Sequence, residues 1–387
     1  MAAKTPLTTA GLDAHAAALE HLTNQSADLS ADPKATIQKP ANHPEALSWL
    51  SRIVPASTLE HLDARFHMGN YVIDRTTGEK SFEAMSIYVR LGMHLLFYGS
   101  EQEKALHWQR VKDLLRSESE KMGHQYDSPE SRAHIQPFIE SFQLEKTLLQ
   151  LRKPNPADYA TFNDFFAREI LESARPIAEP ENALVTSSPA DCRLTAFPTI
   201  DLATTYWIKG DGFTLERLLM DPTLAQEFHG GSMVIARLAP QDYHRWHAPV
   251  SGTVEKITEV PGAYYTVNPQ AINEPGTLDV FCENRRSIMT LQRASESTSS
   301  ATQNRRVAIV AVGAMLVGSI RYVNGVGQVG AEFRRGQCLG AFYYGGSTVV
   351  VLYPPGEVVL DADLVHNSTK EVCETVMSVG WRTGVMT

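Results

Sequence analysis

The spacing of hydrophobic positions changes about half-way along the chain. In the first half, apolar side chains recur at every third or fourth residue, which predicts amphipathic helices over 81–99 and 100–123. The 81–99 stretch, SFEAMSIYVRLGMHLLFYG, is apolar enough to touch a membrane surface, although burial against the rest of the protein is the commoner use of such a helix. The first half is therefore predicted to be helical.

Two shorter helices are predicted before the pattern changes. One covers 128–142, with Ser128 as its N-cap, and the other covers 161–170, capped by Thr161 or Asn163. Side-chain oxygens at these positions can accept hydrogen bonds from the free backbone N–H groups of a first helical turn.

After residue 183 the pattern becomes one of short β-rich runs separated by Gly, Pro and Asn. The predicted strands lie in RLTAFPTI, GSMVIARL, GTVEKITEV, LDVFCEN, VAIVAVGAMLVGSIRYV and STVVVLY. The polar stretch 293–304 is predicted to be a mobile loop. The fold class is therefore α+β, with a helical N-terminal part and a β-rich catalytic domain of barrel or sandwich sheets.

Three regions follow from these patterns. Residues 1–45 are polar, alanine-rich and weakly periodic, so we expect a flexible segment. Residues 46–150 form the helical region, and 151–387 form the β-rich domain.

Composition limits the partners and the compartment. The chain has 387 residues, 43% of them hydrophobic and 20% charged, with a formal net charge of −9. A negative field does not favour nucleic acid or an anionic membrane. Four scattered cysteines without a C-x-x-C pair indicate a reducing compartment. No stretch is long enough for a spanning helix, and no clear targeting signal is present, so we expect a cytoplasmic or peripheral endomembrane protein.

Three Arg-Arg pairs in the last third could contact a phosphate or a lipid head group: 285–286, 305–306 and 334–335. Solvated surface charge is the commoner role, and we expect it for at least two of the pairs. GVGQVG, at 325–330, matches the dinucleotide pattern G-x-G-x-x-G, but no helix follows it and Val350 stands where an acid is needed. We interpret it as a turn.

Ser347 is the first candidate for chemistry. Gly345 and Gly346 precede it in AFYYGGSTVVVLY, and two glycines leave the preceding carbonyl open to close approach. A hairpin with GGS as its turn is the simpler interpretation. The stretch alone does not decide between them.

Two histidines and one aspartate are candidates to act with this serine. His244 and His247 lie in YHRWHAPVSG, where Pro249 and Gly252 argue against a helix and so against a shared metal site. Imidazole readily accepts a hydroxyl proton near neutral pH, and Asp191 could orient it or cap a loop. The spacing of these residues along the sequence is only weak evidence that they act together, because a chain of this length contains many such trios.

Seven motifs taken together resemble the phosphatidylserine decarboxylase family, closest to its eukaryotic endomembrane type. They are SPADCRL, WIKG, RLAPQDYHRWHAPVSG, YTVNP, ENRRS, VGAMLVGSI and LGAFYYGGSTVVV. The likeness runs from about Tyr126 to the C-terminus. The sequence departs from common family patterns at Gly345, Trp246 and Cys192, which concerns the pocket and leaves the substrate open.

The resemblance implies a zymogen that cuts itself between Gly346 and Ser347 into a β chain (1–346) and an α chain (347–387), which stay associated. Ser347 becomes a covalent pyruvoyl cofactor, which forms a Schiff base with the amine of phosphatidylserine and releases CO₂ and phosphatidylethanolamine. It also implies His247 as base, Asp191 as its orienter and His244 as a proton carrier during turnover. No metal is expected, and a homodimer is compatible with the family.

Three other functions remain open from the sequence. Fungal relatives of the family decarboxylate tryptophan with the same group, and Trp246 and Gly345 favour that substrate, whereas YTVNP, ENRRS and GGSTVVV favour the lipid. APVSGTVEKI and VGSIRYV have the look of lipoyl-type strands, so a binding module without catalysis is a second alternative. Ordinary hydrolysis by Ser347 is the third.

Overall fold

The computed structural model describes residues 16–21, 23–24, 69–84, 104–267, 269–272, 278–293, 306–315, 319–323 and 325–387. Its named helices are α5 (Lys104–Asp127), α6 (Ile135–Phe142), α7 (Phe162–Phe166), α8 (Ile200–Tyr206), α9 (Leu215–Leu219), α10 (Pro222–Phe228), α11 (Pro269–Ile272), α12 (Val280–Glu283) and α13 (Ala362–Thr369). Its strands are β1 (Gly69–Asp74), β2 (Lys80–Ala84), β3 (Val185–Ser187), β4 (Cys192–Phe197), β5 (Ser232–Leu238), β6 (Arg245–His247), β7 (Gly252–Val260), β8 (Arg286–Arg293), β9 (Arg306–Gly313), β10 (Ser319–Tyr322), β11 (Glu332–Phe333), β12 (Cys338–Tyr343), β13 (Ser347–Tyr353), β14 (Val358–Leu360), β15 (Glu374–Met377) and β16 (Arg382–Met386).

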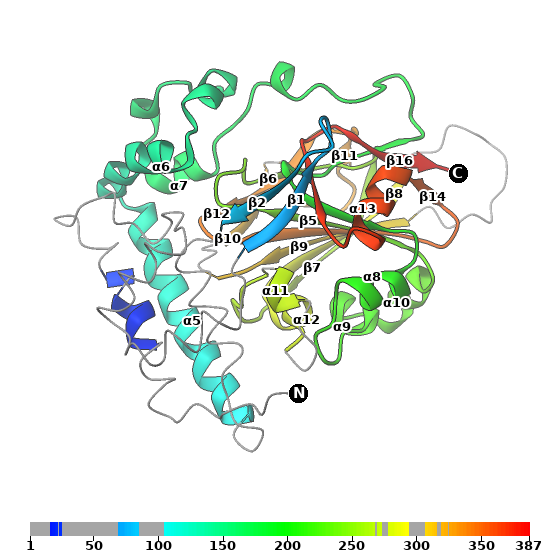
Figure 1. The fold of residues 1–387 in the computed structure, drawn as a ribbon, viewed down its shortest axis with the longest axis horizontal. Helices are drawn as coiled ribbons and strands as arrows, with labels where there is room; N and C mark the ends of the chain where they lie inside the picture. Colours follow the sequence, from blue (N-terminus) through cyan, green and yellow to red (C-terminus); the bar gives the residue numbers. More distant parts are fainter. Residues whose placement is uncertain are drawn as a thin grey trace.

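A ten-stranded sheet forms the centre of the molecule (Figure 1). Its strand order is β11-β7-β8-β9-β13-β5-β4-β15-β1-β2, and its pairs are antiparallel except for the parallel pair β1–β15. Two three-stranded sheets accompany it, in the orders β10-β12-β6 and β14-β16-β3. Helices beside mostly antiparallel sheets confirm the predicted α+β class. The large sheet has two free edges, so the described strands form no closed barrel.

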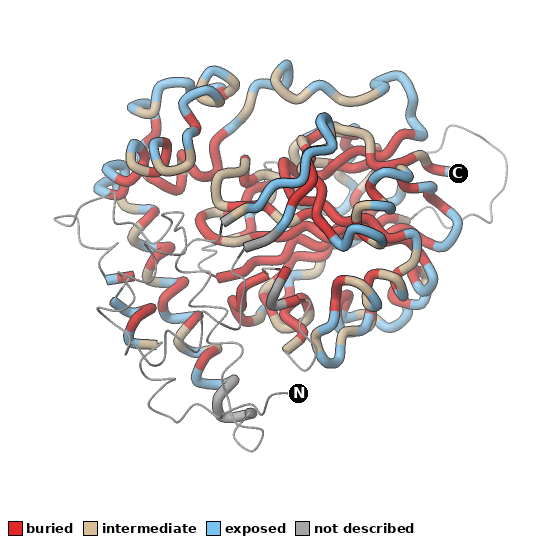
Figure 2. The backbone as a smooth tube through the Cα atoms, in the orientation of Figure 1, coloured by how far each residue is buried: buried red, intermediate tan, exposed pale blue. Residues whose placement is uncertain are grey.

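The central strand β13 is buried on both faces, which explains its run of valines. Val350 and Leu352 belong to the hydrophobic core that also contains side chains of α5, α6 and α7. Val349 and Val351 point to the opposite core, which they share with Trp246 of β6 and residues of the smaller sheets. Figure 2 shows this central part of the sheet as almost continuously buried.

The predicted hairpin between AFYY and TVVVLY does not form. β12 pairs with β10 and β6, whereas β13 pairs with β5 and β9 in the large sheet. The intervening Gly-Gly therefore carries the chain from one sheet to another.

The helical first half is confirmed in part. The predicted helix over 100–123 corresponds to α5, which lies beside the sheets with α6 and α7 (Figure 1). Residues 81–84, where another helix was predicted to begin, belong to strand β2, and 85–99 lie outside the described residues. The β1–β2 pair joins the large sheet through β15. Of the expected flexible segment 1–45, the structure describes 16–21 and 23–24, which are helical.

The first residues of three helical segments show where the capping predictions were right and where they were not. Thr161 caps α7 as predicted, since its hydroxyl accepts a hydrogen bond from the Asp164 N–H at 3.0 Å. Ser128 makes no side-chain cap, and its segment begins with a 3₁₀ helix before α6. The strand predicted in LDVFCEN is wrong, because Asp279 accepts from the N–H groups of Phe281 and Cys282 and starts helix α12.

The other predicted strands are confirmed as β4, β5, β7, β9, β10 and β13. Residues 325–330 form turns before β11, as expected. Of the loop predicted at 293–304, Arg293 is the last residue of β8, and 294–304 lie outside the described residues. None of the helices in the described part of the chain is both long and apolar enough to cross a membrane.

Candidate functional site

Ser347 is the first residue of β13 and is completely buried. Its neighbours in the sheet are Leu238 of β5 and Gly313 of β9. Because both sides of the strand are paired, the backbone around the serine is held firmly in place.

The two residues before Gly346 have unusual backbone angles. Gly345 has φ of 126°, which favours glycine, and Tyr344 has φ of 29°, which is strained for a bulky residue. Aromatic packing holds Tyr344 in this conformation, since its ring centroid lies 4.2 Å from that of Tyr126 and 5.5 Å from that of Phe166. The strained segment therefore ends one residue before the Gly346–Ser347 peptide bond.

Backbone hydrogen bonds fix that bond. The Ala314 N–H donates to the Gly346 carbonyl oxygen at 3.0 Å, and the Gly346 N–H donates to the Met315 carbonyl at 3.2 Å. A donor aimed at a carbonyl oxygen polarises the carbonyl and stabilises negative charge that develops there. The Gly346 carbonyl is thereby prepared for attack.

His244 is the histidine in contact with the serine. Its Nδ1 lies 3.2 Å from Ser347 Oγ, and its Nε2 lies 3.0 Å from the Ala239 carbonyl oxygen. A carbonyl can only accept, so Nε2 carries the proton and the bare Nδ1 accepts from the serine hydroxyl. The ring stacks on Phe166 with a centroid separation of 4.0 Å.

The surroundings keep His244 neutral. Burial, assisted by the positive charge of Arg168, lowers its pKa to about 3. A neutral imidazole with a free Nδ1 lone pair can accept the proton of the serine hydroxyl.

His247 occupies a separate position. Its Nδ1 donates to the Gly336 carbonyl at 2.8 Å, and its Nε2 accepts from the Tyr243 hydroxyl at 3.3 Å. Burial lowers its pKa to about 4, while the hydrogen bond to Gly336 and the charge of Asp191 act in the opposite direction. All four ring nitrogens of the two histidines thus have protein partners, and the two rings do not point at a shared metal position.

Asp191 does not make the expected hydrogen bond to a histidine. Its oxygens accept from the Arg175 guanidinium, at 2.6 Å for Nη2, and from the Val379 N–H at 2.8 Å. These partners occupy the carboxylate, so Asp191 acts on His247 through its charge. The structure brings Ser347 and His244 together, and places Asp191 and His247 nearby without a direct hydrogen bond to the serine.

The sequence interpretation missed a buried ionic network behind His244. Asp242 accepts from the Ala239 N–H at 2.7 Å and from Arg193 Nη1 at 2.5 Å. Ala239 in turn presents its carbonyl to His244. Burial raises the pKa of Asp242 to about 6, although Arg193 opposes this shift. An acid two residues before His244 in QDYHRWH was the available signal.

The network extends across the sheet. Arg193 of β4 also binds Glu83 of β2, and Arg237 of β5 binds Glu374 of β15 at 2.6 Å. The N-terminal strand pair therefore contributes a carboxylate to the charges that hold the His244 loop.

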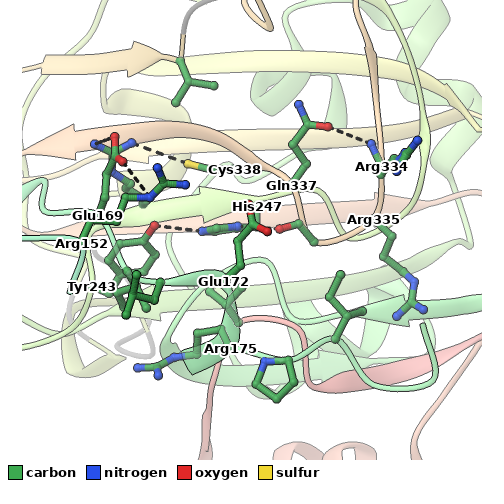
Figure 3. A pocket seen from close by; sticks show the side chains of 18 residues that line it. Arg152, Glu169, Glu172, Arg175, Tyr243, His247, Arg334, Arg335, Gln337 and Cys338 are labelled. Atoms are coloured by element: carbon green, nitrogen blue, oxygen red, sulfur yellow. Dashed lines mark hydrogen bonds and ion pairs between the residues drawn. The ribbon is translucent and has the colours of Figure 1, made fainter. Parts of the chain in front are cut away.

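A pocket of about 660 Å³ lies on the His247 side of the site (Figure 3). Tyr243, Arg245 and His247 contribute to its wall, together with the segments 169–172, 175–177 and 334–338. Its volume is within the range of small-molecule sites. Among the described residues, no cluster of three or more His, Cys, Asp or Glu could hold a metal.

Comparison with known proteins agrees with the motifs around this site. The family model for phosphatidylserine decarboxylase matches residues 162–377, which include Asp191, both histidines and Ser347. The chain belongs to the phosphatidylserine decarboxylase family.

Family members from fungi, plants and bacteria resemble the chain. Phosphatidylserine decarboxylase proenzyme 3 of Schizosaccharomyces pombe is 42% identical over 81% of the chain, and proenzyme 2 of Oryza sativa is 39% identical over 88%. The chain spans 30% and 53% of these two relatives' own lengths. The proenzyme of Fusobacterium nucleatum is 33% identical over 81% of the chain and 96% of its own length.

These relatives confirm the resemblance inferred from the motifs, including its eukaryotic members. Their shared name, proenzyme, describes a decarboxylase made as a precursor. In this member of the phosphatidylserine decarboxylase family, the Gly-Gly-Ser stretch connects β12 of a three-stranded sheet to β13 of the large sheet.

Proposed function

We propose that the chain is a self-processing decarboxylase that converts phosphatidylserine to phosphatidylethanolamine and CO₂. Its precursor is cut between Gly346 and Ser347, and Ser347 becomes a pyruvoyl group. The observation that carries this proposal is the buried Ser347 hydroxyl, bonded to the neutral His244 at the end of a strained segment.

The cleavage uses groups of the chain itself. Ser347 Oγ attacks the Gly346 carbonyl carbon, whose oxygen the Ala314 N–H stabilises. The C–O bond forms and the C–N bond breaks, while the hydroxyl proton passes to the released amino nitrogen. His244 Nδ1 is positioned to carry that proton in this conformation, whereas the resemblance gives the base role to His247.

The ester then eliminates. The Ser347 Cα proton leaves, a Cα–Cβ double bond forms, the Cβ–Oγ bond breaks, and Gly346 becomes the carboxylate end of chain 1–346. Cβ then takes up a proton as the Cα–N bond becomes an imine. Water then replaces the amino nitrogen, which leaves as ammonia, and residue 347 ends in a ketone. All atoms come from the chain and from one net water, so no external cofactor is needed.

The cut chains are expected to stay associated. Strand β13 begins at the cut and lies between β5 and β9, so chain 347–387 supplies the centre of the large sheet. Its valines belong to both hydrophobic cores, and separation would expose them to water.

The residues at the site suit a pyruvoyl group, which supplies an electron-withdrawing carbonyl that draws electrons from the substrate as CO₂ leaves. The side-chain carbon of residue 347 is closed off from solvent, since Ser347 is fully buried. His244 lies beside it and can hold or deliver a proton there. His247 and the Tyr243 hydroxyl form a second proton-carrying pair at the wall of the pocket.

An assay with two substrates tests this function. Purified, self-cleaved protein should release CO₂ from phosphatidylserine in mixed vesicles at a rate at least about tenfold above its rate with free tryptophan. The reason is that the pocket beside His247 is lined by charged and aliphatic side chains, which suit a phospholipid head group better than an indole ring. Release of CO₂ from tryptophan alone would replace the lipid function with that of an amino-acid decarboxylase.

A further inference from the structure

Arg334 lies in the pocket that His247 helps to line, on the turn between β11 and β12. This turn is held firmly. Arg335 donates to the carbonyls of Ala178 and Glu179, and the Arg334 N–H donates to Gln337 Oε1 at 3.1 Å. Gly336, with φ of 80°, lets the turn approach Ile177 closely, because a Cβ there would lie 2.4 Å from Ile177 Cδ1.

The pocket is rich in positive charge. Its wall includes five arginines and two glutamates: Arg152, Arg175, Arg245, Arg334, Arg335, Glu169 and Glu172. Four of the arginines already have partners. Arg175 binds Asp191, Arg335 binds backbone carbonyls and Ser187, and Arg152 and Arg245 both contact Glu169.

The Arg334 guanidinium has no hydrogen bond or ion pair with any residue that the structure describes, and it is exposed to the pocket and solvent. Figure 3 places Arg334 and Arg335 at one end of the pocket, Arg152 and Glu169 at the other, and His247 between them. A guanidinium free at the end of a pocket is suited to bind a phosphate through two hydrogen bonds.

The other two Arg-Arg pairs do not place a free guanidinium in the pocket. Arg286 is buried and donates to the backbone carbonyls of Leu218, Cys282, Asn284 and Arg217. Arg306 pairs with Glu227 and Glu255. Among the described members of the three pairs, Arg334 and the unpaired Arg285 remain, and of these two only Arg334 lines the pocket.

The rest of the wall suits an amphiphile. Six apolar side chains contribute to it: Ile170, Leu171, Pro176, Ile177, Val323 and Val379. The phosphate of a phospholipid lies between its polar head and its apolar glycerol and acyl part, so it meets both kinds of surface.

We propose that Arg334 binds the phosphodiester of the substrate's head group and thereby selects a phospholipid over a free amino acid. This deepens the proposed function and rests on it. The amine of the same head group then points towards His247, which lines the same pocket. Selectivity follows because a free amino acid leaves Arg334 without a partner.

Binding to the uncut Ser347→Ala chain tests this separately from chemistry. Glycerophosphoserine carries the phosphodiester, and serine methyl ester lacks it; both are titrated by calorimetry. Adding Arg334→Gln should weaken glycerophosphoserine binding roughly tenfold to hundredfold, the range for hydrogen bonds to a charged group, and leave the methyl ester unchanged. Arg116→Gln, an exposed arginine on α5 outside the pocket, is the matched control and should change neither.

The same variant is then measured in the self-cleaving protein. Arg334→Gln should still cut itself, which shows that it folds, and should raise KM for phosphatidylserine vesicles about tenfold with little change in kcat. Equal binding of glycerophosphoserine by the Arg334→Gln and parent chains would overturn the site. Arg334-dependent binding by a protein that does not decarboxylate phosphatidylserine would keep the site and reject the function.

Discussion

Ser347→Ala should leave the protein as one uncut chain of 387 residues without decarboxylase activity. The hydroxyl is the group that attacks the Gly346 carbonyl, and its loss removes both the nucleophile and the source of the ketone. The fold should persist, because the substitution removes one atom whose side-chain hydrogen bond is to His244. Denaturing electrophoresis and CO₂ release from phosphatidylserine vesicles measure the two effects.

Thr348→Ala is the matched control. Thr348 is the next residue of β13, is equally buried, and its Oγ1 has no hydrogen-bond partner among the residues that the structure describes. Its hydroxyl is not used in the proposed cleavage, so this variant should cut at the normal bond. A Ser347→Ala chain that still cuts at 346–347, or a Thr348→Ala chain that does not, would assign the nucleophile elsewhere.

Arg193→Met should have the largest effect on stability. Arg193 is 9% exposed and pairs with Glu83 and Asp242 across three segments of the chain. Removing it leaves two carboxylates without their common partner, and breaking a buried ion pair typically costs about 3–5 kcal/mol in the free energy of unfolding. Urea denaturation measures this loss, in a Ser347→Ala background so that every sample is one uncut chain.

Arg382→Met provides the comparison. Arg382 also pairs with two carboxylates, Glu179 and Asp361, but its side chain is 42% exposed. Water screens exposed pairs, so this substitution should cost about 1 kcal/mol or less. Equal losses for the two variants would mean that the network behind His244 is not a special source of stability.

Much of the fold could be predicted from the sequence because the local signals agree with the final structure. The valine run of β13 indicates a strand buried on both faces, and Thr161 caps α7 where expected. LDVFCEN was misread, because the two side-chain hydrogen bonds of Asp279 outweigh the β preference of Val280 and Phe281. The addition of β1–β2 beside β15 joins segments about 300 residues apart, which periodicity cannot reveal.

The sequence names candidate residues for the site but not the contacts that these residues make. The residue types and motifs single out Ser347, His244, His247 and Asp191, but side-chain pairing depends on the folded chain. Asp191 meets Arg175, sixteen residues away, instead of a histidine, and the serine meets His244. Asp242 and the Ala314 N–H act through the backbone geometry of their loops, which no motif specifies.

Self-cleavage and ketone formation are tested most directly by the intact mass of the folded wild-type protein, before and after treatment with phenylhydrazine. We predict two masses, for chains 1–346 and 347–387, with only the shorter chain gaining the mass of one hydrazone. A single full-length mass that does not react with the carbonyl reagent would contradict the proposal.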